Sequence, residues 1–343
     1  MIQTRTLADG GQTPLEVAGL LASFLERAER TLEIAVYDVN LADDTEKLVL
    51  GTLRAAAARG VRVRLLYNLD ERPPGQPVPP PPKTRPDEIE ALPFATCGVP
   101  GWPDLMHHKY VIRDTATVWT GSTNWTDDSW SREENVIAVV ESAAIAERYA
   151  EDYEQLWRAK RVARSGKVSS ELADGIRPWF SPKRGEKLAH RIARAIGRAD
   201  RRVRIASPVI TSGPILGTLA EVVDDGRVDL AGVVDNTQVN EVLRQWAGDP
   251  IKTWKAPALR AVLDGARFSG KHSTPYAPGA THDYMHAKVT VCDDTVFVGS
   301  FNLSHSGESN AENVLELEDA ALAEQMASFV DAVRGRYPAA ELA

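Results

Sequence analysis

Two stretches of this 343-residue chain carry one pattern, HHKYVIRDTATVWTGSTNW at residues 107–125 and HAKVTVCDDTVFVGSFNL at residues 286–303. Each stretch reads His, any residue, Lys, four residues, Asp, and then Gly-Ser-x-Asn, with six residues between Asp and Gly in the first copy and five in the second. A Glu-Asn-Val follows, and its Glu stands ten residues after the Asn in both copies. One such pattern could arise by chance, whereas two in the same order indicate an internal duplication.

Each copy of the pattern begins at the start of a predicted strand. Apolar residues alternate or cluster in YVIRD and TVWTG, and again in VTVCD and TVFVG, as they do in strands. Side chains two residues apart on a strand point to the same face, so His107 and Lys109 can reach one ligand, as can His286 and Lys288. A duplicated fold that brings the two pairs together would form a cradle for one phosphate.

These residue types suit the cleavage of a phosphate ester. A neutral imidazole can attack phosphorus, and a protonated one can donate a proton to the departing oxygen. Lysine supplies positive charge to the equatorial oxygens, where negative charge is spread in the transition state. Short polar side chains in the two Gly-Ser-x-Asn segments are suited to the same oxygens: Ser122, Asn124, Ser300 and Asn302.

The elements around the motifs repeat as well. In the first half, Thr13-Pro14-Leu15-Glu16 has the form of a helix N-terminus, and a strand, a helix and a strand are predicted at residues 32–39, 46–60 and 61–68. The second half repeats the order helix, strand, helix, strand at residues 187–199, 203–210, 214–223 and 228–235.

This alternation predicts an α/β fold, built as two halves whose mixed, largely parallel sheets are flanked by helices. We place the first half at residues 1–165, with its motif at 107–124, and the second at 166–343, with its motif at 286–302. Before the first motif lies PPGQPVPPPPK, residues 73–83, whose prolines favour an extended loop. Both a simple insertion and a lid over the site are open for this segment.

The composition is that of an ordinary globular chain, because hydrophobic residues make up 43% and charged residues 26%. A net charge of -8 disfavours nucleic acid as a partner without excluding it, since nucleic acid is usually bound through many Lys and Arg contacts. Positive charge is concentrated between Arg158 and Arg204, which is more typical of a solvated helix face than of a docking patch.

The N-terminus lacks the features of a signal peptide, and Cys97 and Cys292 do not make a disulfide framework. We therefore expect a cytoplasmic protein without a transmembrane segment. Peripheral contact with a membrane is compatible with this expectation.

The duplicated His-x-Lys-x4-Asp pattern with its Gly-Ser-x-Asn resembles the phospholipase D superfamily, and the resemblance covers most of the chain. It implies a duplicated phospholipase D-like fold with the active site at the interface of the halves. It also implies a phosphodiesterase that works through a covalent phosphohistidine, with no metal and no other cofactor. Because both motifs are in one chain, a monomer is compatible with activity.

The same resemblance implies a role for each motif residue. His107 would be the nucleophile and His286 the general acid and base, and Lys109 and Lys288 would bind the phosphate. The remaining residues match positions with supporting roles: Glu134 and Glu312 match the acidic residue that orients a histidine ring, and Asp114 and Asp293 are expected to stabilise the motif more than to touch substrate.

Three functional hypotheses are compatible with the sequence. A phospholipid head group is the first expected substrate, by hydrolysis or by transfer to another alcohol. The second is a metal-independent nuclease, for which the basic run could supply a groove. The third is a binding scaffold without turnover, which the intact histidines and lysines of both copies disfavour.

A zinc site is the rival for the same residues, because potential ligands gather near the motifs: His107, His108, His282, Asp283 and His286. The lysine two residues after each motif histidine would repel a divalent cation, so the pattern disfavours a metal. His190, His272 and His305 have no motif around them and are expected to be packed structural side chains.

Overall fold

The computed structural model describes residues 1–71, 82–247, 249, 252, 254–277 and 279–342. Of the proline-rich segment expected to be an extended loop, only Pro82 and Lys83 lie within the described residues.

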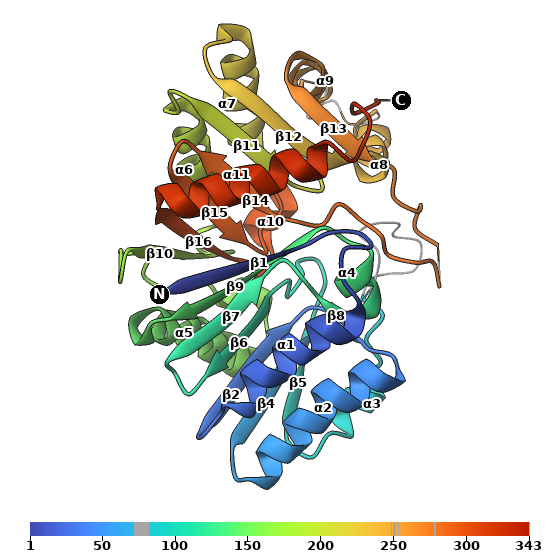
Figure 1. Cartoon of the computed structure of the whole chain (residues 1–343), viewed down its shortest axis with the longest axis vertical. Coiled ribbons are helices and arrows are strands. Elements are labelled where there is room, and N and C mark those ends of the chain that lie inside the picture. Colours follow the sequence, from blue (N-terminus) through green and yellow to red (C-terminus); the bar gives the residue numbers. More distant parts are fainter. Residues whose placement is uncertain (72–81, 248, 250–251, 253, 278, 343) are drawn as a thin grey trace.

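Two seven-stranded sheets with the same strand order form the frame of the molecule (Figure 1). The first has the order β1-β9-β7-β6-β2-β4-β5, and the second the order β10-β16-β15-β14-β11-β12-β13. Strands of the first sheet are β1 (Ile2–Leu7), β2 (Thr31–Val36), β4 (Arg62–Leu69), β5 (Ala95–Pro100), β6 (Lys109–Arg113), β7 (Thr117–Gly121) and β9 (Asn135–Glu141). Strands of the second are β10 (Ile176–Phe180), β11 (Arg202–Ala206), β12 (Asp229–Asp235), β13 (Arg267–Lys271), β14 (Val289–Cys292), β15 (Thr295–Gly299) and β16 (Asn313–Glu318).

The expected class, a duplicated α/β fold with mixed sheets, is confirmed, but the sheets are less parallel than expected. In the first sheet only β2, β4 and β5 run parallel, and the other pairings are antiparallel. The second sheet repeats this arrangement. The motif strands β6 and β7 follow one another through a short turn, and such neighbours pair antiparallel because no crossover helix separates them.

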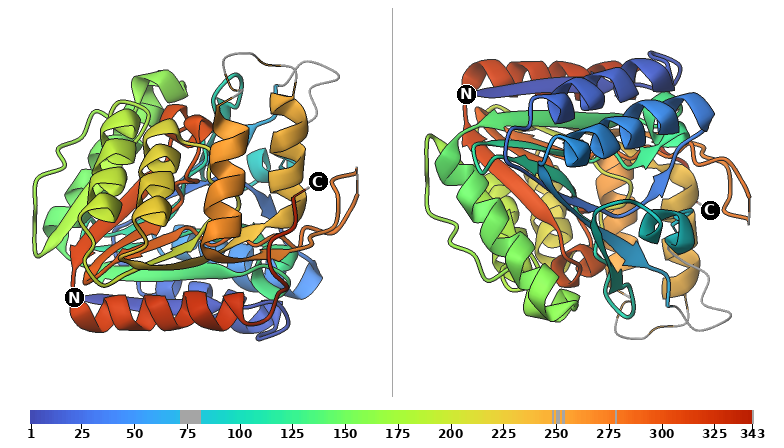
Figure 2. Two further views of the ribbon diagram at one scale, coloured as in Figure 1. Left: turned by 90° about the horizontal axis from the view of Figure 1, so that it is seen from above. Right: turned by 90° about the horizontal axis from the view of Figure 1, so that it is seen from below.

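Helices cover the outer face of each sheet, as the views from above and below show (Figure 2). The outer face of the first sheet carries α1 (Pro14–Glu26) and α2 (Asp43–Ala58), and α3 (Pro86–Glu90) lies beside β5. The outer face of the second carries α6 (Gly185–Gly197), α7 (Gly213–Asp225), α8 (Asn236–Trp246) and α9 (Lys255–Gly265). The remaining short elements are β3 (Val39–Asn40), β8 (Trp125–Thr126), α4 (Asp127–Ser131), η1 (Val162–Arg164) and α10 (His305–Ser309).

Local signals in the sequence set the ends of several helices. Thr13 and Glu16 form the reciprocal capping box that begins α1, with Pro14 in its first turn. Gly226 ends α7 with a φ of 65°, a left-handed conformation that glycine adopts without steric cost.

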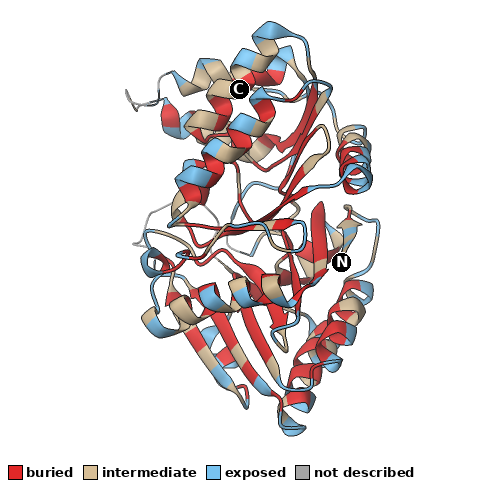
Figure 3. Cartoon of the chain, turned by 90° about the vertical axis from the view of Figure 1, so that its left-hand side faces the viewer, coloured by how far each residue is buried: buried red, intermediate tan, exposed pale blue. Residues whose placement is uncertain are grey.

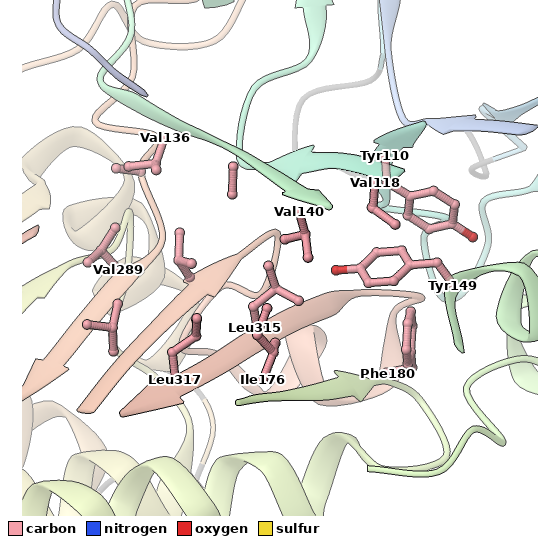
Figure 4. Close-up of a cluster of buried hydrophobic side chains, with 14 of the residues drawn as sticks. Tyr110, Val118, Val136, Val140, Tyr149, Ile176, Phe180, Val289, Leu315 and Leu317 are labelled. Atoms are coloured by element: carbon pink, nitrogen blue, oxygen red, sulfur yellow. The ribbon is translucent and has the colours of Figure 1, made fainter. Parts of the chain in front are cut away.

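The inner faces of the two sheets share one hydrophobic core (Figure 4). Val118 and Val140 of the first half and Val289 and Leu315 of the second are fully or almost fully buried in it. Two helices pack against the inner faces and belong to the same core, α5 (Ala143–Ala159) and α11 (Ala320–Arg334). Buried residues accordingly run through both sheets and through the space between them (Figure 3).

Because apolar surface removed from water stabilises by about 25 cal/mol per Å², this shared core holds the halves together and brings the starts of β6 and β14 to one interface. The boundary between residues 165 and 166 remains a prediction.

No helix of the described residues is both long enough and apolar enough to cross a membrane.

Candidate active site

The two His-x-Lys segments meet at the interface, and each is held by the opposite half. The N–H of His107 donates to the carbonyl oxygen of Ala311 at 2.9 Å, and the N–H of His286 donates to that of Glu134 at 3.2 Å. The preceding methionines are held within their own halves, where Asn68 Oδ1 accepts the N–H of Met106 and Asp235 Oδ2 accepts that of Met285. Sequence reasoning missed Asn68 and Asp235, although each ends a predicted strand.

The functional side chains converge on one place. The ring centroids of His107 and His286 are 6.4 Å apart, and the two residues are only 6% and 9% exposed. Each lysine ammonium donates to the carbonyl oxygen of its own motif histidine, Lys109 at 2.7 Å and Lys288 through a shorter contact. Both lysines are almost completely buried. The structure thus brings together the two predicted His-Lys pairs.

Burial and mutual charge shift the pKa values of this group. Burial first, and then the two neighbouring ammonium groups, hold the pKa of His107 and the pKa of His286 well below the ordinary value. Burial also lowers the pKa of Lys109 and of Lys288. Each imidazole is therefore neutral near pH 7, and an incoming anion would raise all four pKa values because it stabilises the protonated forms.

A carboxylate from the second half orients His107. Both oxygens of Glu312 lie 2.9 Å from His107 Nδ1, so Nδ1–H donates to the carboxylate and Nε2 is left with its lone pair. Glu312 is fully buried and also accepts from the Ser300 hydroxyl and the Asn310 amide. Burial raises the pKa of Glu312 to about 7.

His286 has a different partner. Its Nδ1 lies 3.1 Å from Asn135 Oδ1 and 3.4 Å from the carboxylate of Glu133. The amide orientation of Asn135 is fixed, because its nitrogen donates to the Ser129 carbonyl and to Glu133 while its oxygen accepts from Ser122. Burial raises the pKa of Glu133. An amide therefore orients His286, with a carboxyl group beside it.

The sequence repeat is shifted by one residue relative to the structural repeat. Ser300 N–H donates to the Asn313 carbonyl, and Ser122 N–H donates to that of Val136. Asn135 is therefore the structural counterpart of Glu312, with eleven residues from Asn124 to Asn135 against ten from Asn302 to Glu312. The matching Glu-Asn-Val letters concealed this extra residue, and only the doubled glutamate of Glu133 and Glu134 hinted at it.

The side chain of Glu134 therefore does not contact His286, the ring that it was expected to orient. Its carboxylate contacts Lys271 at 3.0 Å and accepts from the hydroxyl of Tyr337, both in the second half. Lys271 also lies 3.2 Å from Asp9 and donates to the carbonyl of Arg132. The side chain of Glu134 thus binds the halves together, and the carboxylate that contacts His286 is that of Glu133.

The other predicted residues divide into two groups. The Ser122 and Ser300 hydroxyls are fully buried and donate to Asn135 and Glu312, so they support the orienting side chains. Asp114 accepts the backbone N–H groups of residues 29–31, and Asp293 accepts those of residues 200–202, away from the histidines.

The Gly and Asn of each Gly-Ser-x-Asn have separate uses. A Cβ at Gly121 would collide with the carbonyl oxygen of Val136, and a Cβ at Gly299 with that of Asn313, so close approach of the strands requires glycine. The Oδ1 atoms of Asn124 and Asn302 are buried without a hydrogen-bond partner in the described structure. Both oxygens therefore remain available to a hydrogen-bond donor on a ligand.

His108 is fully buried and contacts both halves. Its Nε2 lies 2.9 Å from the buried carboxylate of Asp152, and its Nδ1 lies 3.2 Å from the Asn313 amide nitrogen. Asn313 also accepts from Thr120 and Tyr149. This chain of contacts crosses the interface through His108 and Asn313, which follow His107 and Glu312 in the sequence.

Among the described residues, no three His, Cys, Asp or Glu side chains gather in a group that could hold a metal ion. The expectation of a metal-free reaction remains a prediction.

A family model described as "Cardiolipin synthase, PLD-like domain" matches residues 21–157 and 192–333 of the chain. The mitochondrial cardiolipin hydrolase of Xenopus tropicalis is 27% identical over 142 residues, which is 40% of this chain and 60% of that protein. The match thus spans less than two thirds of that relative's length.

Two solved structures share the fold over nearly the whole chain. The phosphatidylserine synthase of Haemophilus influenzae Rd KW20 has a TM-score of 0.68 at 13% identity, covering 97% of this chain and 85% of that one. The polyphosphate kinase of Porphyromonas gingivalis has a TM-score of 0.61 at 12% identity, covering 96% of this chain and 46% of that one. At these identities the likeness shows the fold alone.

Proposed function

Because this chain belongs to the phospholipase D superfamily, we propose that it cleaves a phospholipid at its head-group phosphodiester through a covalent phosphohistidine. The observation that carries this proposal is the meeting of two His-Lys pairs, one from each half, with ring centroids 6.4 Å apart. No metal or other cofactor enters the proposed reaction.

In the first step, Nε2 of His107 attacks phosphorus while the bond from phosphorus to the leaving oxygen breaks. Nε2 of His286 donates the proton that this oxygen needs. In the second step, water attacks the phosphohistidine and gives its proton to His286, and the nitrogen–phosphorus bond breaks. Lys109 and Lys288 stabilise the charge on the equatorial oxygens, and Asn124 and Asn302 bind the same phosphate.

The unequal partners of the two histidines support this division of roles. A carboxylate that accepts a hydrogen bond from Nδ1–H makes an imidazole more basic. Glu312 is placed to do this for His107 and to stabilise the positive charge that the ring acquires on attack. A neutral amide leaves the protonated ring more acidic, which suits proton donation by His286. The incoming phosphate anion would raise the pKa of His286 enough for its Nε2 to be protonated.

The substrate class has to be argued from charge and from the relatives, since one fold hosts several reactions. Several arginines of the basic run that a nuclease groove would need are engaged with acidic side chains: Arg191 with Glu316, Arg202 with Glu324, and Arg204 with Asp229 and Asp331. Together with the net charge of -8, this pairing favours a lipid over a nucleic acid. The name of the cardiolipin hydrolase relative points the same way.

We propose further that one chain is sufficient for activity, because the described residues of each half supply an orienting partner to the other half's histidine. The halves are proposed to divide at residues 165 and 166. A cytoplasmic protein that meets its lipid at the membrane surface is part of the same proposal.

A panel of substrates tests the function. In parallel assays with and without EDTA, we expect equal turnover of phosphatidylglycerol or phosphatidylcholine in mixed micelles and of bis(p-nitrophenyl) phosphate, and no turnover of single-stranded DNA or RNA. Activity that disappears with EDTA and returns with zinc or magnesium would contradict the metal-free reaction. Cleavage of nucleic acid alone, with binding that falls steeply between low and physiological salt, would establish the nuclease instead.

Anion binding to the site should weaken as pH rises through about 7. The pKa of Glu312 is raised to about 7, so this carboxyl gains negative charge above that pH, while Lys288, whose pKa is lowered, loses positive charge. For each proton that the site must take up to bind sulfate, the Kd of sulfate should rise about tenfold per pH unit above 7. Calorimetry at constant ionic strength between pH 6 and 8.5 measures this, because sulfate keeps its own charge there. A Kd that is constant or falls with pH would contradict the assigned electrostatics.

A further inference from the structure

We propose that His282 and Tyr284 form a subsite beside His286 for the leaving alcohol, and that this subsite selects an alcohol with further hydroxyl groups, such as glycerol. The inference rests on the proposed function, because it assigns the leaving group to the side of the acid His286.

The local chain direction places a row of side chains next to the phosphate, and we define this row as Lys288, His286, Tyr284 and His282. Met285 and Ala287 point into the central hydrophobic core, so Tyr284, His286 and Lys288 point to the opposite side. The ring centroids of His282 and Tyr284 are 5.2 Å apart. The row therefore continues outward from the phosphate-binding lysine and the acid histidine to a phenol and a second imidazole.

Tyr284 has a polar group with no protein partner. The residue is 7% exposed, and its hydroxyl is buried without a hydrogen bond among the described residues. A buried hydroxyl in this state is destabilising unless a ligand supplies its partner, so it is a candidate to bind a ligand. The hydroxyl is also within electrostatic range of Glu133, the carboxylate that contacts His286. The two motif asparagines at the same site share this unpaired state.

Two carboxylates lie beside the row, and one of them, Asp283, accepts the backbone N–H and the hydroxyl of Thr274. Lys83 pairs with Asp128 at 2.8 Å, and Asp128 also accepts the backbone N–H of His282. Burial, assisted by Lys83, lowers the pKa of His282 to about 4, so its imidazole is neutral near pH 7. A neutral imidazole and a phenol offer both donors and acceptors, which match the hydroxyl groups of an alcohol. This chemistry fits a neutral hydroxylated alcohol.

The first half has no such row. By the correspondence of the two motif histidines, Leu105 stands where Tyr284 does and Pro103 stands where His282 does. Leu105 has no polar side-chain atom, and its backbone N–H donates to Asn310. The pair of His282 and Tyr284 therefore has no counterpart at the matching positions before His107.

The reverse of the first chemical step gives a direct test. When an alcohol replaces water, its oxygen bonds to phosphorus, the His107 nitrogen–phosphorus bond breaks, and the hydroxyl proton passes to His286. With bis(p-nitrophenyl) phosphate as donor and equal concentrations of glycerol and 1-propanol as acceptors, phosphorus NMR measures the ratio of the two phosphodiester products. We expect the wild-type protein to favour glycerol and Tyr284→Phe to lower the ratio about tenfold. Tyr276→Phe, a change at an exposed tyrosine on the same segment, should leave the ratio as in the wild type.

The outcomes separate the subsite from the function. A ratio that is unchanged in Tyr284→Phe overturns the subsite. So does a wild-type protein with no preference for glycerol, or one that makes neither alcohol product while it still hydrolyses the donor; these two measurements stand even if Tyr284→Phe fails to fold. A wild-type protein that releases no p-nitrophenol and cleaves no lipid overturns the proposed function, and the subsite with it.

Discussion

His107→Asn should abolish turnover, with a loss of about 10⁴-fold or more, because the proposed mechanism then lacks its nucleophile. Acid-sensitive phosphoryl label, trapped by rapid quenching during turnover of a radioactive diester, should appear on the peptide that contains His107. The label should be absent in His107→Asn. Digestion and mass spectrometry locate it.

His286→Asn should also be nearly inactive on a natural substrate, but for a different reason. The leaving oxygen then lacks its acid, and the water of the second step lacks its base. An activated aryl leaving group needs little protonation, so this variant should still accumulate label on His107. Label found only on His286 would reverse the two roles. If neither histidine is labelled and product forms in one inverting step, the covalent mechanism is rejected.

Glu312→Gln should lower kcat by about 10²- to 10⁴-fold, the range typical of losing the carboxylate that supports a catalytic imidazole. The glutamine oxygen can still accept Nδ1–H of His107, so orientation survives while the charge that stabilises the developing cation is lost. Glu133→Gln should cost only about tenfold, because Asn135 already accepts from His286 at 3.1 Å. Steady-state rates on bis(p-nitrophenyl) phosphate measure both.

Glu318→Gln is the matched control for this comparison, since Glu318 is an exposed glutamate at the end of the same strand as Asn313. It should leave kcat unchanged. A larger loss in Glu133→Gln than in Glu312→Gln would show that the carboxylate beside His286 is the more important one. That result would contradict the proposed roles of the two histidines.

Local patterns in the sequence were enough to find the two His-Lys pairs that the structure brings together. The alternation of apolar residues in VTVCD and TVFVG predicts strands, and period-two geometry puts His286 and Lys288 on one side of the chain. The capping box at Thr13 likewise needs only four consecutive residues, and it is present. Such features depend on neighbours in the chain, so they can be predicted without the fold.

The pairing direction of the strands was harder to predict from the sequence. Repeated helices between strands suggested largely parallel sheets, and this holds for β2, β4 and β5. β6 and β7 pair antiparallel because only a short turn joins them, and β6 then pairs antiparallel with β2. The choice of neighbour within a sheet is made by packing between distant segments.

The sequence by itself determined the duplication, the two His-Lys pairs and the glycines that let the strands approach closely, because each is set by residue type and spacing within one short stretch. Only the tertiary structure decided which side chain orients which histidine. Glu312 meets a ring 205 positions earlier in the chain, and a single extra residue before Asn135 turns Glu134 toward Lys271 and leaves an amide facing His286. A one-residue shift changes the side of the chain on which each side chain lies, and the packing of the two sheets then fixes what it meets.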